Sequence, residues 1–331
     1  DTSEKSEVNA FLKSAETQSK IQSGSLQVRM IFEGYAAPEQ NEAKMKVVED
    51  IGIDVRFLGS GKKVHHKFAV IDGDTTDAKL ITGSANWSLS SLTSYNENIL
   101  FINEEQELAE SFQQQFELLW ANAKEFGQIG DASAISVDSV EMSENTRSHF
   151  NSDNFKFGPG GVKNNPDAQG FHLTRQVVRA IESAESEIEI ASTRLKLRPI
   201  YEALREAGER GVKIKMVISQ DDFLPIWMRE KGELKDCADI YEPKCSSGVS
   251  YGQFLTEVPN AEVRVKYYNL RYSEYISKQM HSKYILIDGT HLLSGSFNWS
   301  VSSEREHIEN VVELRGSKHS EVLEQFSADF A

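Results

Sequence analysis

Histidine and lysine recur in this chain at a fixed spacing, in the pattern H-x-K-x-x-x-x-D. An imidazole can attack phosphorus or donate a proton near neutral pH, and a lysine ammonium is a point charge for phosphate oxygens. The pattern therefore predicts chemistry on a phosphate group. Its members are His65, Lys67 and Asp72 in the first copy and His281, Lys283 and Asp288 in the second.

A second phrase, G-S-x-N-W-S, follows each copy, and its serine and asparagine offer further hydrogen-bond donors. A glutamate comes 11 positions after the asparagine in both copies, as Glu97 and Glu309. Three phrases in the same order, twice, indicate an internal repeat. Two copies supply two imidazoles, and covalent phosphodiester cleavage needs one to attack and one to protonate the leaving oxygen. The donors are Ser84 and Asn86 in the first copy and Ser296 and Asn298 in the second.

Short apolar runs at 68–71 and 284–287 predict buried strands behind both motifs. His65 and Lys67 are two apart, so on a strand they project from one face. An Asp-Gly turn signal follows each run, and return strands are expected at 80–82 and 292–294. The Gly-Ser-x-Asn turn would then lie beside the His-Lys pair.

These phrases resemble the HKD signature of the phospholipase D superfamily, H-x-K-x(4)-D followed by G-S-x-N, in both halves of the chain. The wording HHKFAVID with LITGSANWS is most similar to a branch that holds bacterial HKD nucleases and mitochondrial cardiolipin hydrolase-like proteins. That branch often has one motif per chain and dimerises. This chain has two motifs, so we expect it to build the site internally and to be a monomer.

The resemblance implies an α/β fold of two pseudo-twofold-related lobes, each a mostly parallel sheet flanked by helices. It also implies a mechanism in which one motif histidine attacks phosphorus and the other protonates the leaving alcohol, with no metal or cofactor. The phosphohistidine is then released by water or by a second alcohol. The implied roles are phosphoryl binding for Lys67, Lys283, Ser84, Asn86, Ser296 and Asn298, imidazole orientation for Glu97 and Glu309, and a more structural part for Asp72 and Asp288.

Strands and helices alternate along the chain, which favours βαβ units. The second copy opens with a helix and a strand that the first copy lacks, so the first lobe is expected to be incomplete at its N-terminal side. The expected lobes are 1–130 and 168–331, joined by a polar crossing segment at 131–167 in which Phe155 and Phe157 act as anchors. Helices are predicted at 9–15, 41–50, 105–126, 171–183 and 200–207, and further strands at 26–32, 54–58, 187–191, 212–218 and 262–266.

The composition of the 331 residues, 39% hydrophobic and 26% charged, suits a globular protein of two domains. The net charge of −15 argues against broad nucleic-acid binding, which normally needs a basic face. No apolar run approaches a membrane span, and the first residues do not read as a signal peptide. Cys237 and Cys245 either bridge a loop or are free thiols. A bridge is our expectation, and with it a secreted or periplasmic protein.

The expected substrate is a glycerophospholipid at a membrane or micelle surface, with head-group exchange as a side activity. The apolar segment 223–228 and the tyrosines at 267, 268, 272 and 275 either face lipid or pack in the core. The alternative enzyme is a nuclease of the same family. The alternative without catalysis is an HKD-derived protein that binds lipid or nucleic acid.

Overall fold

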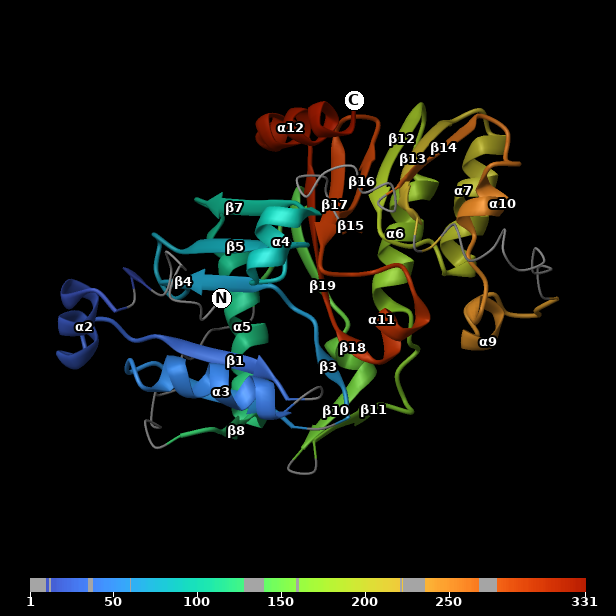
Figure 1. Ribbon diagram of the computed structural model, residues 1–331. Coiled ribbons are helices and arrows are strands. Elements are labelled where there is room, and N and C mark those ends of the chain that lie inside the picture. The colour runs from blue at the N-terminus through green and yellow to red at the C-terminus, as the bar shows by residue number, and fades with distance from the viewer. Residues whose placement is uncertain are drawn as a thin grey trace.

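The computed structural model describes residues 10–11, 13–34, 38–59, 61–127, 140–158, 161–220, 222, 236–267 and 279–331. Two lobes stand side by side, the first in blue to teal and the second in yellow to red (Figure 1). Within the described part of the chain, no helix combines the length and apolar character needed to cross a bilayer.

The second lobe is built on a seven-stranded sheet of order β14-β13-β12-β16-β17-β19-β9. Strands β12 to β14 pair in parallel, as the alternating helices and strands predict. The remaining strands pair antiparallel, and among them a short turn joins β16 directly to β17. Their bounds are β12 Glu187–Ser192, β13 Lys213–Ser219, β14 Ala261–Lys266, β16 Lys283–Ile287, β17 His291–Gly295, β19 Asn310–Arg315 and β9 Thr146–Phe150.

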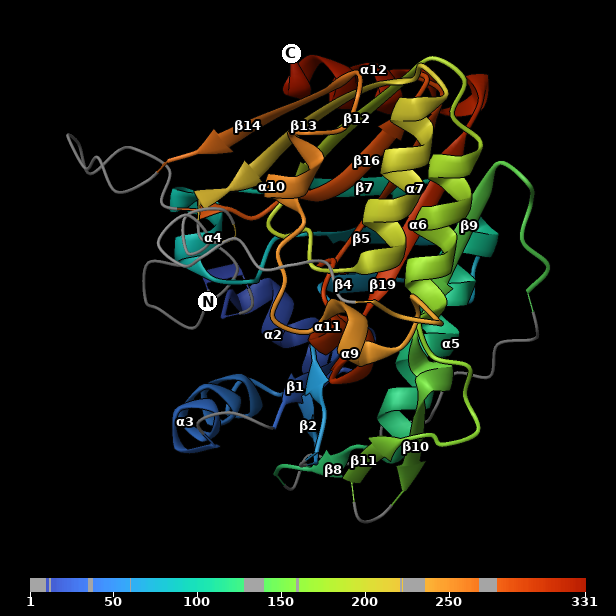
Figure 2. The ribbon, with the colours of Figure 1, turned by 90° about the vertical axis from the view of Figure 1, so that its right-hand side faces the viewer.

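Helices cover both faces of this sheet because its central strands are apolar on both sides. Ile285 and Ile287 pack under α6 (His172–Glu182) and α7 (Arg198–Glu209), which lie next to each other in Figure 2. Tyr284 and Leu286 face the opposite way, toward α12 (Ser320–Phe330) and the first lobe. The H-x-K-x(4)-D motif of the second lobe thus leads into a fully buried strand.

The strands of the first lobe form two separate sheets, β1-β2-β8 and β4-β5-β7. Strands β1, β2, β4, β5 and β7 correspond to β13, β14, β16, β17 and β19, and no strand equivalent to β12 lies between β1 and β4 among the described residues. The sheet face that α6 covers in the second lobe is open here, so Phe101 is 71% exposed. The bounds are β1 Arg29–Glu33, β2 Asp54–Leu58, β4 Phe68–Ile71, β5 Lys79–Gly83, β7 Ile99–Asn103 and β8 Lys124–Glu125.

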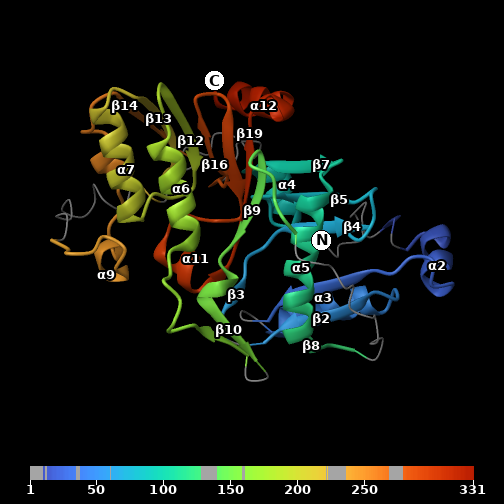
Figure 3. The same cartoon turned by 180° about the vertical axis from the view of Figure 1, so that it is seen from behind.

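Helix α5 (Gln106–Asn122) covers the other face of β4, β5 and β7, and Figure 3 shows it from behind. Two further helices, α2 (Ala15–Gln22) and α3 (Pro38–Glu49), belong to this lobe. Residues 10 and 11 are helical, as predicted for 9–15, and α2 is a separate helix whose start the Ser14 hydroxyl caps by accepting from the backbone N–H of Thr17. Residues 1–9 and 12 lie outside the described part.

The crossing segment contributes structure to both lobes. Strand β9 joins the edge of the second lobe's sheet, and a 3-10 turn at Ser152–Asn154 leads into the hairpin β10 (Phe155–Gly158) and β11 (Gly161–Asn164). Phe155 is buried against Leu58 and Leu119 of the first lobe, with Phe157 partly buried beside it. The two phenylalanines therefore anchor the hairpin, as their sequence context predicts.

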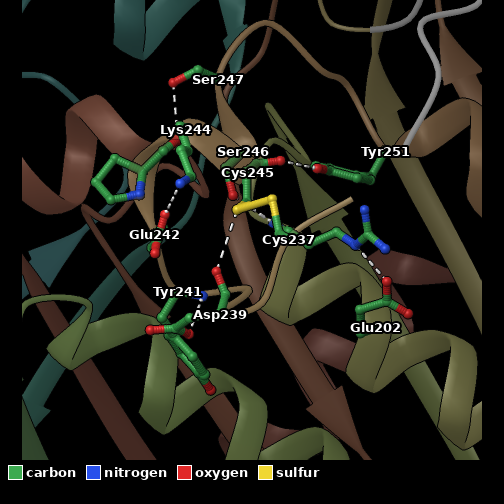
Figure 4. Close-up of a disulfide and its surroundings, with 12 residues drawn as sticks. Glu202, Cys237, Asp239, Tyr241, Glu242, Lys244, Cys245, Ser246, Ser247 and Tyr251 are labelled. Atoms are coloured by element: carbon green, nitrogen blue, oxygen red, sulfur yellow. Dashed lines mark hydrogen bonds and ion pairs between the residues drawn. A yellow bond between two sulfur atoms is a disulfide. The ribbon is translucent and has the colours of Figure 1, made fainter. Parts of the chain in front are cut away.

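Cys237 and Cys245 form a disulfide with a Cα–Cα distance of 6.2 Å (Figure 4). The bridge holds the short helix α9 (Pro243–Ser246), and Tyr251 donates its hydroxyl to the Cys245 carbonyl at 2.8 Å. Helix α10 (Gly252–Leu255) follows. The free-thiol alternative is therefore wrong for this structure. The segment 223–228 and Tyr268, Tyr272 and Tyr275 lie outside the described residues, and Tyr267 is exposed.

Candidate active site at the lobe interface

Each motif histidine enters the site on a strand that pairs with the opposite lobe. Strand β3 (Lys63–Val64) runs parallel to β18 (His307–Ile308), and the His65 backbone N–H donates to the Ile308 carbonyl at 3.1 Å. Strand β15 (Gln279–Met280) pairs in the same way with β6 (Tyr95–Asn96), and the His281 N–H donates to the Asn96 carbonyl at 2.9 Å. This exchange brings both motifs to one interface.

The same exchange gives each imidazole a carboxylate from the other lobe. His65 Nδ1 lies 2.8 Å from Glu309 Oε2, and His281 Nδ1 lies 2.8 Å from Glu97 Oε1. An ionised carboxylate can only accept, so the proton is on Nδ1 and the lone pair is on Nε2. Both glutamates therefore sit where the sequence places imidazole-orienting groups, and each serves the histidine of the opposite repeat.

Four serines hold these two carboxylates in place. Ser84 and Ser296 of the G-S-x-N phrases donate to Glu97 and Glu309, each at 2.6 Å. Their predicted phosphate-binding role does not fit this geometry, because the single hydroxyl proton of each is committed to a glutamate. Ser91 and Ser303 donate to the other oxygen of the same carboxylates.

Sequence reasoning missed Ser91 and Ser303, although a signal was present. Each comes five positions after the G-S-x-N asparagine in its repeat. The serine three residues before each one caps a short helix, α4 (Leu89–Ser94) or α11 (Val301–Arg305), and turns the later serine toward the glutamate. A shared offset in two repeats identifies such positions without an alignment.

The glycine of each G-S-x-N phrase is required by a close backbone approach. A Cβ on Gly83 would lie 2.3 Å from the Asn98 carbonyl oxygen, and a Cβ on Gly295 would lie 2.3 Å from that of Asn310. Those two asparagines then bond across the lobes, Asn98 Nδ2 to Ser294 Oγ at 2.7 Å and Asn310 Nδ2 to Thr82 Oγ1 at 3.2 Å. The turns are therefore locked against each other.

The two motif lysines are buried together in this site, at 7% exposure for Lys67 and 3% for Lys283. Lys67 Nζ donates to the His65 carbonyl at 2.5 Å, and Lys283 Nζ donates to that of His281. Burial lowers the pKa of Lys67 to about 8, an effect that Glu309 opposes. Burial, reinforced by Lys67, lowers the pKa of Lys283 to about 7. Two buried ammonium groups that repel each other favour an anion between them.

Burial also disfavours the charged form of both imidazoles. It lowers the pKa of His65 to about 3, against the opposing effect of Glu309 and with reinforcement from Lys67 and Lys283. The pKa of His281 is lowered for the same first reason. Lys62, three residues before His65, pairs with Glu306 of the second lobe.

The remaining members of the motifs lie around this centre. Asn86 and Asn298 are half-buried in the turns that carry Ser84 and Ser296. Asp288 accepts hydrogen bonds from three backbone N–H groups at the start of β12, at 2.8 Å each, which fits the expected structural part. Asp72 is exposed at the corresponding position. Because no counterpart of β12 lies among the described residues, the first lobe has no equivalent strand start from which Asp72 could accept such hydrogen bonds.

His66, the other histidine of the first motif, has no access to the phosphate site. It is half-buried, its Nδ1 donates to Asn310 Oδ1 at 3.0 Å, and its Nε2 accepts from Gln115 at 3.2 Å. Burial lowers its pKa to about 4. It thus ties the segment before β4 to β19 across the interface.

One pair of residues breaks the twofold symmetry of the site. The ring of His307 packs on His65 with centroids 5.3 Å apart, whereas Tyr95 packs on His281 at 5.8 Å. His307 and Tyr95 occupy the same position in the two repeats, two residues before the glutamate. Among the described residues, His65, His307 and Glu309 form a group whose ligand atoms all lie within 4.8 Å, close enough for a metal ion.

A separate cavity of about 520 Å³ lies away from the motif residues, between the β10–β11 hairpin and α6. His172 and Arg175 line it together with Phe155 and Phe157. None of the motif side chains contributes to its lining, so the chemistry predicted from the sequence belongs to the lobe interface.

Comparisons with known proteins point to one family. Residues 6–120 and 177–331 match the family described as "Cardiolipin synthase, PLD-like domain". A 70-residue stretch is 49% identical to the mitochondrial cardiolipin hydrolase of Danio rerio, covering 21% of this chain and 29% of that protein. A 148-residue stretch is 24% identical to the phospholipase D of Rickettsia prowazekii, covering 45% of this chain and 57% of that protein. Both matches span less than two thirds of the relative's length.

The crystal structure of phosphatidylserine synthase from Haemophilus influenzae has the same two-lobed fold. It superposes with a TM-score of 0.60 at 13% identity, over 98% of this chain and 77% of that one. At this identity the likeness concerns the fold alone. With a family match over both halves and two H-x-K-x(4)-D motifs meeting in one site, the chain belongs to the phospholipase D superfamily.

Proposed function

We propose that this chain is a phospholipase D-type phosphodiesterase. It hydrolyses the distal phosphodiester bond of glycerophospholipids to phosphatidic acid and a free head-group alcohol. The observation that carries this proposal is the pairing of two imidazole–carboxylate couples with two buried, mutually repelling ammonium groups in one interface. A phosphodiester anion satisfies both lysines, and its phosphorus then lies where an imidazole Nε2 can reach it.

In the proposed mechanism His65 attacks phosphorus through Nε2, and the bond to the head-group oxygen breaks. His281, in its imidazolium form with a proton on each ring nitrogen, protonates that oxygen from Nε2 as it leaves. The same imidazole then removes a proton from water, which attacks the phosphohistidine and restores His65. A second alcohol in place of water gives head-group exchange. Lys67 and Lys283, with the half-buried amides of Asn86 and Asn298, bind the phosphoryl oxygens as charge builds on them.

Glu309 and Glu97 keep both imidazoles in the tautomer this mechanism needs. Each holds the proton on Nδ1 at 2.8 Å, so Nε2 presents its lone pair or its transferable proton to the substrate. His281 gives one proton to the leaving alcohol and regains one from water, so the protons balance over the cycle.

A lipid substrate fits the chain better than a nucleic acid. The net charge of −15 disfavours the approach of a polyanion such as a nucleic acid. The two buried lysines are a local exception within this acidic chain. The similarity to proteins named cardiolipin hydrolase and phospholipase D supports the same choice. We further propose a monomer that acts at a membrane or micelle surface. The Cys237–Cys245 bridge supports an oxidising location, secreted or periplasmic.

A paired assay tests this function. Head-group release from phosphatidylcholine and from cardiolipin is measured beside cleavage of single-stranded DNA, with the His65→Ala/His281→Ala double variant as the blank. Head-group release that the double variant lacks supports the proposal. Cleavage of DNA alone would make the chain a nuclease, and activity on none of the substrates would leave the binding-protein alternative.

A further inference from the structure

The two halves of the site differ at one ligating position. His307 packs on His65 in one half, and Tyr95 packs on His281 in the other. An imidazole nitrogen binds borderline-soft metals such as Zn²⁺, whereas a neutral phenol is a poor ligand for them. The two halves of the site should therefore differ in their affinity for metal ions.

His307 also carries an unsatisfied polar atom. Its Nδ1 is buried without a hydrogen-bond partner among the described residues. It lies 3.6 Å from Glu309 Oε1, which is beyond hydrogen-bond reach. A buried nitrogen of this kind calls for a water or an ion.

The distances between the three ligands suit a small tetrahedral ion. His65 Nδ1 lies 2.8 Å from Glu309 Oε2, and the ligand atoms of His65, His307 and Glu309 all fall within 4.8 Å. Bonds of about 2.0–2.1 Å in tetrahedral geometry separate ligand atoms by about 3.3 Å. Small side-chain shifts are enough to reach that spacing, and two histidines with one glutamate form a common zinc ligand set.

We propose that the His65 half-site binds one Zn²⁺ ion through His65, His307 and Glu309, and that this ion inhibits the enzyme. The ion replaces the Nδ1 proton of His65, which moves through solvent to Nε2. The imidazole remains neutral, but its Nε2 lone pair is no longer available to attack phosphorus. The inhibition rests on the proposed function, whereas the binding of the ion does not.

The test compares the wild type with His307→Tyr, because the equivalent Tyr95 shows that a phenol fits beside a motif histidine. Zinc chloride is titrated into each protein by calorimetry, and hydrolysis of bis(4-nitrophenyl) phosphate is measured in parallel. We expect one Zn²⁺ per wild-type chain and at least tenfold inhibition. The variant is expected to lose that binding, and its remaining hydrolysis is expected to be insensitive to zinc. His172→Ala, which removes a histidine outside the site, is expected to match the wild type.

Two outcomes would overturn the proposal. One is zinc binding of equal stoichiometry and affinity in His307→Tyr, and the other is full wild-type hydrolysis with zinc bound. Thermal unfolding checks that the variant is folded, and His307→Ala replaces it if it is not. A wild type that hydrolyses nothing would refute the proposed function, while calorimetry would still decide the metal site.

Discussion

Glu309 of the second lobe holds His65 of the first, with 2.8 Å between Oε2 and Nδ1. Glu97 holds His281 in the reciprocal direction at the same distance. Neither motif histidine pairs with the glutamate of its own repeat. The reactive unit is therefore the interface, and a change in either lobe acts on the chemistry of both.

Replacing either motif histidine is expected to abolish turnover. His65→Ala or His281→Ala alone should lower kcat by at least about 10³-fold, because members of one catalytic unit are strongly non-additive. The rate of head-group release from phosphatidylcholine measures this effect, and the double variant should be little worse than either single one. A single variant that kept a tenth of wild-type turnover would refute the shared site.

The glutamates should act across the lobes. Glu309→Gln can turn its NH₂ group toward His65 Nδ1 and so favour the tautomer whose Nε2 carries the proton. We expect kcat to fall at least tenfold, with little change in KM. Imidazole ¹⁵N NMR provides a readout that is independent of turnover. The His65 signals should change tautomer while those of His281 do not, and Glu97→Gln should give the opposite pattern. Unchanged His65 signals would rule out the cross-lobe assignment.

Much of this site is readable from the sequence, because local patterns carry it. The apolar runs behind the motifs predict the positions of β4 and β16, and β16 is buried as expected. In contrast, β4 is only partly buried with Ile71 exposed, and His65 and Lys67 lie just before β4 rather than on a strand. The pairing of each histidine with the other lobe's glutamate is not readable, because it depends on β3 and β15 crossing between lobes. The paired segments lie 244 and 184 residues apart in the sequence, so no local pattern indicates that they pair.

The sequence predicts phosphate binding for Ser84, and this prediction is wrong for a related reason. A serine beside an asparagine in a tight turn offers a donor, and the sequence does not say which acceptor receives it. The structure shows Glu97 in that position, 13 residues away, at 2.6 Å. Burial of Glu97 makes a committed donor necessary, since an unpartnered buried carboxylate is costly.

Ser91 and Ser303 should be needed to hold the carboxylates. Ser303→Ala removes a donor from the fully buried Glu309, and a hydrogen bond to a charged group contributes about 1.5–3 kcal/mol. We expect the free energy of unfolding in urea to fall by about that amount, and kcat to fall with KM unchanged. Ser302→Ala, one position earlier in α11, is the matched control. Equal stability of the two variants would contradict this role.

Binding of a phosphate-like anion should take up protons near pH 8. The pKa values of Lys67 and Lys283 are about 8 and about 7, so both lysines are partly deprotonated there. A bound anion favours the charged ammonium and raises both pKa values. Calorimetric titration with inorganic phosphate at pH 8, in buffers of different ionisation enthalpy, measures the uptake. Lys283→Met should reduce it, and proton release in the wild type would contradict the lysine assignment.

The last prediction concerns which histidine becomes phosphorylated. The nucleophile must be neutral, and the acid must carry its proton at Nε2 when the alcohol leaves. Burial and the two lysines hold the pKa of His65 at about 3, and burial also lowers the pKa of His281, whose ring contacts Tyr95 rather than His307. The strongly disfavoured charge on His65 suits the nucleophile, and we expect His65 to attack. Stopping the reaction of a slow substrate with alkali and sequencing the peptides by mass spectrometry should find phosphohistidine at His65. Phosphate on His281 would reverse the two roles while leaving the shared site intact, and phosphate on neither would argue against a covalent route.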